Sequence, residues 1–289
     1  MLLKEPRRTL TFFDGKWFEG NPPLMGPFTH GAWMGQVAWD GARAFRRLAP
    51  DLDLHCQRLV RSARTLGLDP KITADELTAL AWAGIEQFPA EAELYIRPIV
   101  YAEDGFITPD AASTRWMMSV LDAPLPRDRR HTACLSTTRR PAPDMAVTDA
   151  KCAAQYTNIA RAAREAYARG FDTAVVLDPW DNVAELATAN IFLVKDGGVK
   201  TPKPNGTFLV GITRTRTIGL LREAGVAVEE ATIGFDELKA ADEVFACGTF
   251  AKIVPIVRIE DRELPPGPVT ARARALYFAW AESCGRRGA

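Results

Sequence analysis

The stretch TAVVLDPWDNVAELATANIFLV, residues 173–194, restricts the fold more than any other part of this 289-residue chain. Its two ends are short apolar runs rich in β-branched residues, which predict buried strands. Between them, Glu185 lies in the sequence NVAELATANIF with no charged neighbour. An ionised carboxylate in an apolar interior costs roughly several kcal/mol unless a cation or hydrogen bonds compensate it. The stretch therefore predicts a buried sheet and a cationic partner for Glu185 from elsewhere.

Before residue 122, short strands and helices alternate in the pattern of a small α+β domain. Turn signals and helical spacing define the expected elements. They are a hairpin at Asp14-Gly15, short strands around Asp40-Gly41, a helix that starts at Asp51 or Asp53 and ends at Gly67, a helix at 73–88, and strands at 93–103 and 115–123.

The segment DAPLPRDRRH, residues 122–131, combines prolines and charges and is the best linker candidate in the chain. Beyond it, strands dominate and helices surround them, as in QYTNIARAAREAYARG and GITRTRTIGLLREAG. The sequence thus predicts a small N-terminal domain at 1–122, a linker at 123–131 and a larger C-terminal domain at 132–289. The fold class is α+β with two domains.

Composition excludes several classes of function. The 36 basic and 36 acidic residues give no net charge, which argues against nucleic acid as a partner because phosphate binding needs a basic surface. The basic runs at 128–130 and 138–140 are expected to be solvated loop charges. Five cysteines without a CxxC pair and three histidines favour a reducing compartment and no metal. No apolar stretch is long enough to span a membrane, so a cytoplasmic location is expected.

Two features could bind a planar, phosphorylated ligand. Lys151, in VTDAKCAAQYTN, lies among small residues that leave room for a planar group, although the spacing alone favours an ordinary exposed lysine. In GITRTRTIGLLREAG the amides of Ile212 and Thr213 open a helix and form a ready anion site. Arg58 and Thr249 could complete it. The alternative is a structural helix and a surface arginine.

Several motifs together carry a family resemblance that none of them carries alone. They are DGKW, DGARAF followed by LHxxRLxxSA, YIRP, AKCAAQYTN, VAELATANIF, TP, GITR and ADEVFACGT, in this order. The chain resembles the class IV aminotransferases, the fold-type IV pyridoxal-phosphate (PLP) enzymes, over roughly residues 11 to 283. This group includes branched-chain and D-amino-acid aminotransferases, (R)-selective amine transaminases and aminodeoxychorismate lyase. The resemblance implies a small N-terminal α/β domain and a larger, β-barrel-like C-terminal α/β domain.

The resemblance also implies the cofactor site. Lys151 would form the Schiff base with PLP and move the proton during transamination. Glu185 would face the pyridine nitrogen and keep it protonated, so the cofactor itself would be the missing cation. The phosphate would be bound by Arg58, the amides of Ile212 and Thr213, and Thr249. Tyr156 would donate a hydrogen bond to O3′ of the cofactor. Asn190 matches a family asparagine to which no role is assigned.

Substrate choice is less sharply defined. LYIRP resembles the branched-chain enzymes, in which Tyr95 and the amides near Thr249 would take the α-carboxylate. Arg97 would then take a second carboxylate. The pocket is also expected to include Met34, Trp39, Arg43 and Phe250. Met34 stands where branched-chain enzymes have a tyrosine, and Phe250 replaces a small residue, so the lining is unusually apolar.

The sequence therefore predicts transfer of an amino group from a hydrophobic, branched-chain-like amino acid or a primary amine to a 2-oxo acid. The WDG motif at 39–41 is similar to that of (R)-selective amine transaminases, so an (R)-amine or D-amino-acid transaminase is the main alternative. An aminodeoxychorismate-type lyase and a non-enzymatic PLP carrier are the others. The resemblance implies a homodimer in which the partner's small domain reaches the site.

Overall fold

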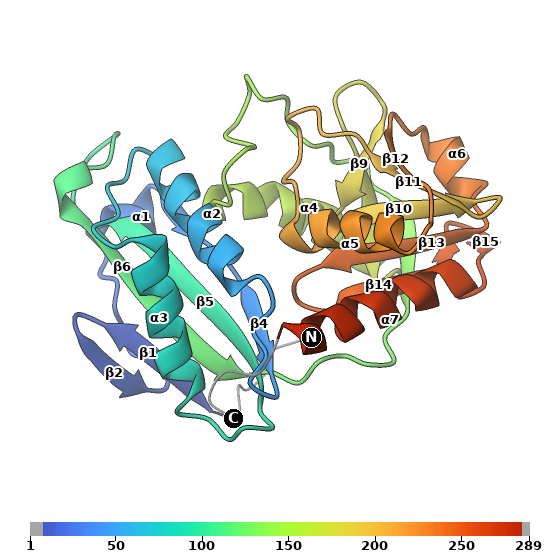
Figure 1. The fold of residues 1–289 in the computed structure, drawn as a ribbon. Coiled ribbons are helices and arrows are strands. Elements are labelled where there is room, and N and C mark those ends of the chain that lie inside the picture. The colour runs from blue at the N-terminus through green and yellow to red at the C-terminus, as the bar shows by residue number, and fades with distance from the viewer. Residues whose placement is uncertain (1–7, 285–289) are drawn as a thin grey trace. The chain divides into compact units, whose positions relative to one another are not determined.

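A computed structural model describes residues 8–284 of the chain, which divide into two compact units (Figure 1). The first unit holds the described residues up to Leu125, with Ala150–Ala154 and the segment that begins at Ala281. The second holds Pro126–Asp149 and Gln155–Trp280. Ala150–Ala154, predicted as part of the C-terminal domain, thus groups with the first unit, where Cys152 forms a β-bridge with Ala38.

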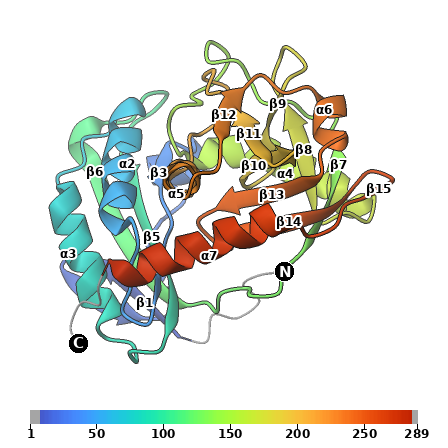
Figure 2. The same cartoon turned by 45° about the vertical axis from the view of Figure 1, so that its right-hand side comes forward.

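The first unit is an antiparallel sheet with helices on it. Among the described residues the sheet runs β2-β1-β6-β5-β3, with β4 also paired to β5. The helices α2 and α3 lie side by side on this unit (Figures 1 and 2). The elements are β1 (Thr9–Phe13), β2 (Lys16–Glu19), α1 (His30–Trp33), β3 (Val37–Trp39), β4 (Ala42–Phe45), α2 (Leu52–Thr65), α3 (Ala74–Ile85), β5 (Glu93–Ala102) and β6 (Thr114–Asp122).

Local sequence signals explain several of these element boundaries. The turn between β1 and β2 has positive φ at both Asp14 and Gly15, as a tight two-residue hairpin requires. Thr73 and Glu76 form a capping box at the start of α3, which satisfies two main-chain N–H groups. Gly67, with φ 75°, ends α2. Leu59, Ala63 and other apolar residues of α2 join the buried core of the unit.

The second unit is built on a longer mixed sheet. Its described strands run β12-β11-β10-β13-β14-β7-β8-β9, with β15 paired to β14. The strands are β7 (His131–Leu135), β8 (Thr173–Leu177), β9 (Val183–Leu186), β10 (Asn190–Lys195), β11 (Gly198–Pro202), β12 (Val228–Ala231), β13 (Glu243–Gly248), β14 (Lys252–Ile259) and β15 (Arg262–Glu263). The helices are α4 (Tyr156–Ala168), α5 (Ile212–Glu223), α6 (Phe235–Lys239) and α7 (Pro268–Ser283).

This sheet curls, because β9 at one end of the order also lies against β10 and β11 near the other end (Figure 2). Buried side chains from the curled strands form an apolar core that includes Val175 of β8, Leu186 of β9 and Ile191 of β10. A second core, around Phe192, Phe245 and Tyr277, packs beneath α5 and α7. The predicted strands at both ends of 173–194 are present as β8 and β10, and Glu185 lies on β9 between them.

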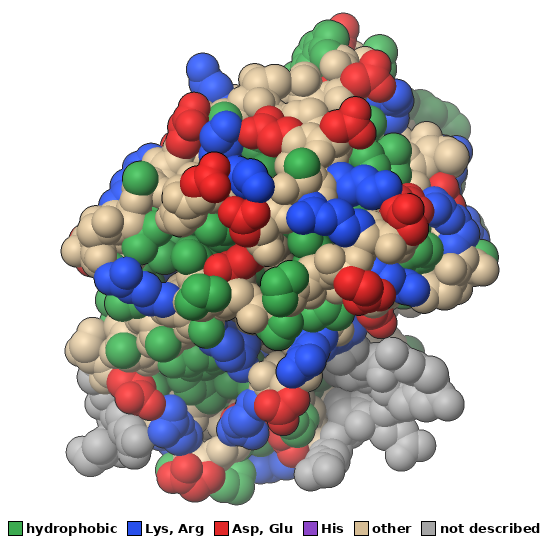
Figure 3. Space-filling model, turned by 90° about the vertical axis from the view of Figure 1, so that its right-hand side faces the viewer, with side chains coloured by type: hydrophobic (Ala, Val, Ile, Leu, Met, Phe, Trp, Pro, Cys, Tyr) green, Lys and Arg blue, Asp and Glu red, His purple; other side chains and the backbone are tan. Residues whose placement is uncertain are grey.

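The surface reflects the neutral composition. On the face in Figure 3, acidic and basic side chains are interspersed with apolar ones. Among residues 8–284, no helix is both long and apolar enough to cross a membrane.

Candidate functional site

Lys151 is held by main-chain contacts in the first unit. Its N–H donates to Ser62 Oγ on α2 at 3.0 Å, and its carbonyl accepts from Trp39 N at 3.1 Å. The amine Nζ lies 4.1 Å from the centre of the Trp39 ring, within range of a cation–π interaction. The side chain is half-buried. A lysine anchored in this way presents its amine at a defined place while its main chain stays fixed.

Arg58, the predicted phosphate ligand, forms part of a buried triad. Asp40 Oδ2 accepts from Arg58 Nε at 2.7 Å, and Oδ1 accepts from Nη2 at 2.9 Å. His55 Nδ1 lies 2.7 Å from the same Oδ1. Burial alone would raise the pKa of Asp40, but the charges and hydrogen bonds of Arg58 and His55 hold it well below its usual range. The arginine is thus oriented by an ionised carboxylate.

Tyr95 and Arg97 lie on β5, beside the extended segment Asp40-Gly41 that joins β3 to β4. A Cβ at Gly41 would overlap the Tyr95 hydroxyl, so the close approach requires glycine at this position. Burial raises the pKa of Tyr95 to about 12, which keeps the hydroxyl protonated and able to donate. The Arg97 guanidinium carbon lies 5.4 Å from the Tyr95 ring centre, and its buried Nε has no hydrogen-bond partner among the described residues. This pair of donors suits a carboxylate.

Two other residues predicted for the substrate pocket have different surroundings. Arg43 is fully buried, and its guanidinium donates to the main-chain carbonyls of Ala123 and Pro124. Burial lowers its pKa to about 10. These bonds tie Arg43 to the segment after β6, so we propose a structural role for it. Met34 is half-buried directly after α1.

Glu185 is buried on β9, opposite Val176 of β8. The chain itself supplies a cation for it, because Arg140 Nε lies 3.4 Å from Glu185 Oε1. The Asn190 side-chain amide donates to Oε2 at 3.4 Å. The expectation that residues 138–140 are solvated loop charges is therefore wrong for Arg140, whose side chain is 7% exposed. The expectation that the cofactor is the cationic partner of Glu185 is incomplete, because it leaves out Arg140.

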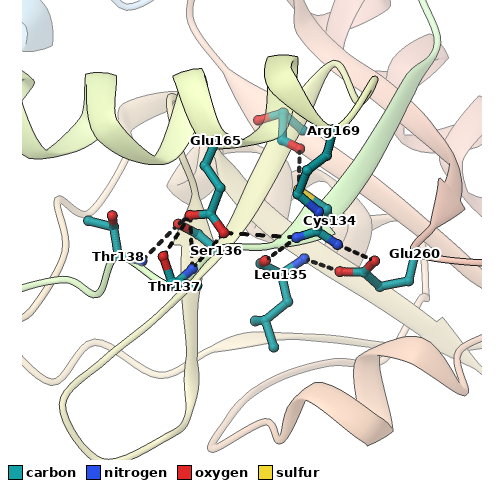
Figure 4. A network of polar contacts seen from close by, with 9 residues as sticks. Cys134, Leu135, Ser136, Thr137, Thr138, Glu165, Arg169 and Glu260 are labelled. Carbon is teal, nitrogen blue, oxygen red and sulfur yellow. Dashed lines mark hydrogen bonds and ion pairs between the residues drawn. The ribbon is translucent and has the colours of Figure 1, made fainter.

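The segment that leads from β7 to Arg140 is fixed by the polar network in Figure 4. Glu165 of α4 accepts from the Ser136 hydroxyl at 2.8 Å and from Thr137 N at 2.9 Å. Arg169 donates to the Leu135 carbonyl at 2.9 Å. Arg140 then donates from Nε to the Thr207 carbonyl, and its own N–H bonds the Leu177 carbonyl of β8. Arg140 is thus anchored at both main chain and side chain.

The start of α5 has the features of an anion site. No side chain caps it, and its first turn carries no acidic residue. The first N–H groups of any α-helix have no hydrogen-bond acceptor within the helix, and here they include those of Ile212 and Thr213. A Cβ at Gly211 would overlap Asn190 Oδ1, while Asn190 Nδ2 donates to the Leu209 carbonyl at 3.1 Å. Asn190 thus links Glu185 to the segment that opens α5.

The other predicted residues of the second unit lie at the ends of elements. Tyr156 is the first residue of α4 and is half-buried. Thr249 and Phe250, also half-buried, form the turn between β13 and β14.

Each unit therefore gathers part of the predicted set. In the first unit, the segment Trp39–Gly41, which leads from β3 to β4 along β5, contacts three predicted residues. Its three successive residues contact Lys151, Arg58 and Tyr95 in turn. In the second, Glu185 and Asn190 are joined to the start of α5. Three residues of these networks were not predicted from the sequence: Asp40, His55 and Arg140. The HxxR spacing on one face of α2 is the signal that could have identified the triad. Among residues 8–284, no three His, Cys, Asp or Glu side chains are grouped to hold a metal.

Comparison with known proteins gives consistent results. The family model for amino-transferase class IV matches residues 38–259. A probable branched-chain-amino-acid aminotransferase from Aquifex aeolicus (strain VF5) is 31% identical over 96% of this chain and 94% of that protein. An aminotransferase from Brucella abortus, solved bound to the co-factor PLP, is 44% identical, with a TM-score of 0.94 over 96% of this chain and 100% of that one.

A third comparison is with the branched-chain aminotransferase from the archaeon Thermoproteus uzoniensis, solved with norvaline. It is 30% identical, with a TM-score of 0.88, over 96% of this chain and 95% of that one.

Proposed function

The chain belongs to the class IV aminotransferase family, and we propose that it transfers the amino group of a hydrophobic amino acid or primary amine to a 2-oxo acid. It is a PLP-dependent aminotransferase of fold type IV. The substrate class and the role of each residue are our proposal. The observation that carries the proposal is the segment Trp39–Gly41, where three successive residues contact Lys151, Arg58 and Tyr95.

The side chains present fit the cofactor. Each chemical part of PLP has a matching group: an amine for the aldehyde, a buried carboxylate for the ring nitrogen, and an arginine with an uncapped helix start for the phosphate. When bound, PLP supplies the aldehyde that accepts the amino group and a protonated ring that withdraws electrons. The buried, unpartnered Nε of Arg97 adds a donor for a substrate carboxylate.

We assign the covalent link and the proton transfer to Lys151. Its Nζ would release the cofactor when the amino donor binds, and would then take the proton from the donor Cα. The Trp39 ring would hold the amine nearby between these events. Trp39 would also add apolar lining for the donor.

Glu185 would hold a proton on the ring nitrogen, and Tyr156 would donate a hydrogen bond to the ring O3′. Arg58 would bind the phosphate together with the amides of Ile212 and Thr213 and the hydroxyl of Thr249. Asn190 would hold Glu185 at a fixed position relative to the start of α5.

For the substrate, we propose that Tyr95 and Arg97 receive carboxylates, as in the sequence prediction. Met34 and Phe250 offer no polar group that could support a second carboxylate. The guanidinium of Arg97 would then have to turn aside or keep water when an apolar donor is bound. Hydrophobic donors should therefore react with a higher kcat/KM than glutamate.

A donor panel tests this proposal. It compares L-leucine, L-glutamate, D-alanine and (R)-1-phenylethylamine, with pyruvate and 2-oxoglutarate as acceptors. We expect L-leucine to exceed L-glutamate, and Arg97→Leu to reduce 2-oxoglutarate use more than pyruvate use. Arg115→Leu, which removes a surface arginine of the same unit, is the matched control. A preference for glutamate or for D-alanine would contradict the assignment, as would pyruvate release without an amino acceptor.

We propose that the protein forms a homodimer through its first unit. Phe28, Phe106 and Ile107 are 92%, 70% and 68% exposed, and the half-exposed Trp33 lies 5.6 Å from Phe106 between ring centres. Exposed aromatic side chains that lie together, as Trp33 and Phe106 do, are typical of an interface. Light scattering should give a dimer mass, and Phe106→Ser should lower it.

The five cysteines, none in a disulfide among the described residues, support our proposal of a cytoplasmic location.

A further inference from the structure

We propose that Asp40 is a positioning residue that holds Arg58 in the orientation in which it binds the cofactor phosphate. The inference rests on the phosphate role proposed for Arg58. Asp40 itself would not touch the cofactor and would act only through the arginine.

The geometry of the pair is specific. Asp40 engages Nε and Nη2 along one edge of the guanidinium, with N–O distances of 2.7 and 2.9 Å. This side-on pairing fixes the plane of the group and does not use Nη1. Arginine otherwise has many rotamers and can reach water, so an anchored edge determines where the other end points.

Asp40 is well suited to act as an anchor because its own position is fixed. It is fully buried, and its N–H donates to the Pro98 carbonyl of β5 at 3.1 Å. Its Oδ1 also accepts from Gly41 N at 2.7 Å. His55 holds the same oxygen from the adjacent turn of α2. Asp40 is thus held by its contacts with β5 and Gly41 on one side and with His55 of α2 on the other.

Two effects of Asp40 oppose each other. Its negative charge offsets the charge of Arg58 and weakens the attraction for a phosphate dianion, whereas its hydrogen bonds keep the guanidinium in place. Arg58 has a side-chain exposure of only 9%. A buried guanidinium that loses its carboxylate would be costly and would move toward water. We therefore expect positioning to outweigh charge compensation.

The test separates phosphate binding from general stability. Full-length apoenzyme is titrated with PLP and with pyridoxal, which lacks the phosphate, and the absorbance change gives each Kd. We expect Asp40→Asn to weaken PLP binding by about tenfold, the value of one charge-assisted hydrogen bond, and pyridoxal binding by less than about twofold. A merely structural role for Asp40 would weaken both ligands equally.

Four further variants make the result decisive. Arg58→Ala should show the same selective loss, and adding Asp40→Asn to it should cause no further loss. Arg58→Lys keeps the charge but not the side-on pair, so it should resemble Arg58→Ala even if Asp40→Asn does not fold. Glu243→Gln is the control for a buried carboxylate, because Glu243 accepts from Thr270 N at 2.8 Å at the start of α7. It should lower stability without changing the ratio of the two Kd values.

The outcomes distinguish this inference from the proposed function. If Arg58→Ala loses PLP selectively while Asp40→Asn and Arg58→Lys bind it normally or more tightly, the positioning role is wrong and the phosphate role stands. If Arg58→Ala binds PLP normally, the phosphate role of Arg58 and the inference are both wrong. The covalent role of Lys151 is tested separately and does not depend on either result.

Discussion

The ion pair between Arg140 and Glu185 leads to a prediction whose size follows from the structure. Its N–O distance is 3.4 Å, and the two side chains are 7% and 10% exposed. At an effective dielectric constant of about 20, the attraction is about 5 kcal/mol, and desolvation reduces the net loss on removing one partner to about 3 kcal/mol. Arg140→Met should therefore lower the free energy of unfolding of the apoenzyme by about 3 kcal/mol.

The loss should be smaller in the presence of PLP, because the ring nitrogen would then offer Glu185 a second cationic partner. Urea unfolding of apo and PLP-loaded protein, wild type and variant, measures both values. Arg139→Met is the matched control, since Arg139 pairs with Asp181 on the surface and should contribute less than about 1 kcal/mol. An equal loss with and without PLP, or a loss no larger than that of the control, would refute this reasoning.

Two further predictions concern Glu185 and His131. Glu185→Gln should retain PLP but lower kcat by orders of magnitude, because a neutral amide does not favour a protonated ring nitrogen; near-normal kcat would contradict its role. Burial, with a contribution from Arg129, lowers the pKa of His131 from 6.5 to about 4. Between pH 6.5 and 4, the unfolded chain therefore binds more protons at His131 than the folded chain does. The contribution of neutral His131 to the free energy of unfolding is complete above pH 6.5 and is lost as the pH falls toward 4. Urea unfolding at pH 4.5 and 7 should show a smaller difference in His131→Gln than in the wild type.

Much of the fold could be predicted from sequence because its signals are local. The Asp14-Gly15 turn, the capping box of Thr73 and Glu76, and the glycine stop at Gly67 each depend on residues a few positions apart. The apolar runs at both ends of 173–194 likewise predicted the strands β8 and β10. The helix α1 was missed, since four residues are too short for a periodic pattern.

The contacts of the site were harder to predict because they join distant residues. Glu185 and Arg140 are 45 positions apart, and their proximity depends on the way β7 follows β14 and precedes β8 in the sheet. Basic residues in a loop usually are solvated, and nothing in TRR marks the second arginine as buried. The sequence predicts only that Asp40 lies between two short strands, because its pairing with Arg58 requires α2 to pack beside β3.

The covalent role of Lys151 is the central claim, and borohydride reduction tests it most directly. Reduction of the PLP-loaded enzyme fixes the cofactor on the lysine that carries it, and peptide mapping by mass spectrometry identifies that residue. Lys252 is the internal control, as a fully buried lysine on β14. We predict the label on the peptide that contains Lys151, and its loss together with turnover in Lys151→Ala. A label on Lys252, or a Lys151→Ala variant that retains activity, would contradict the account.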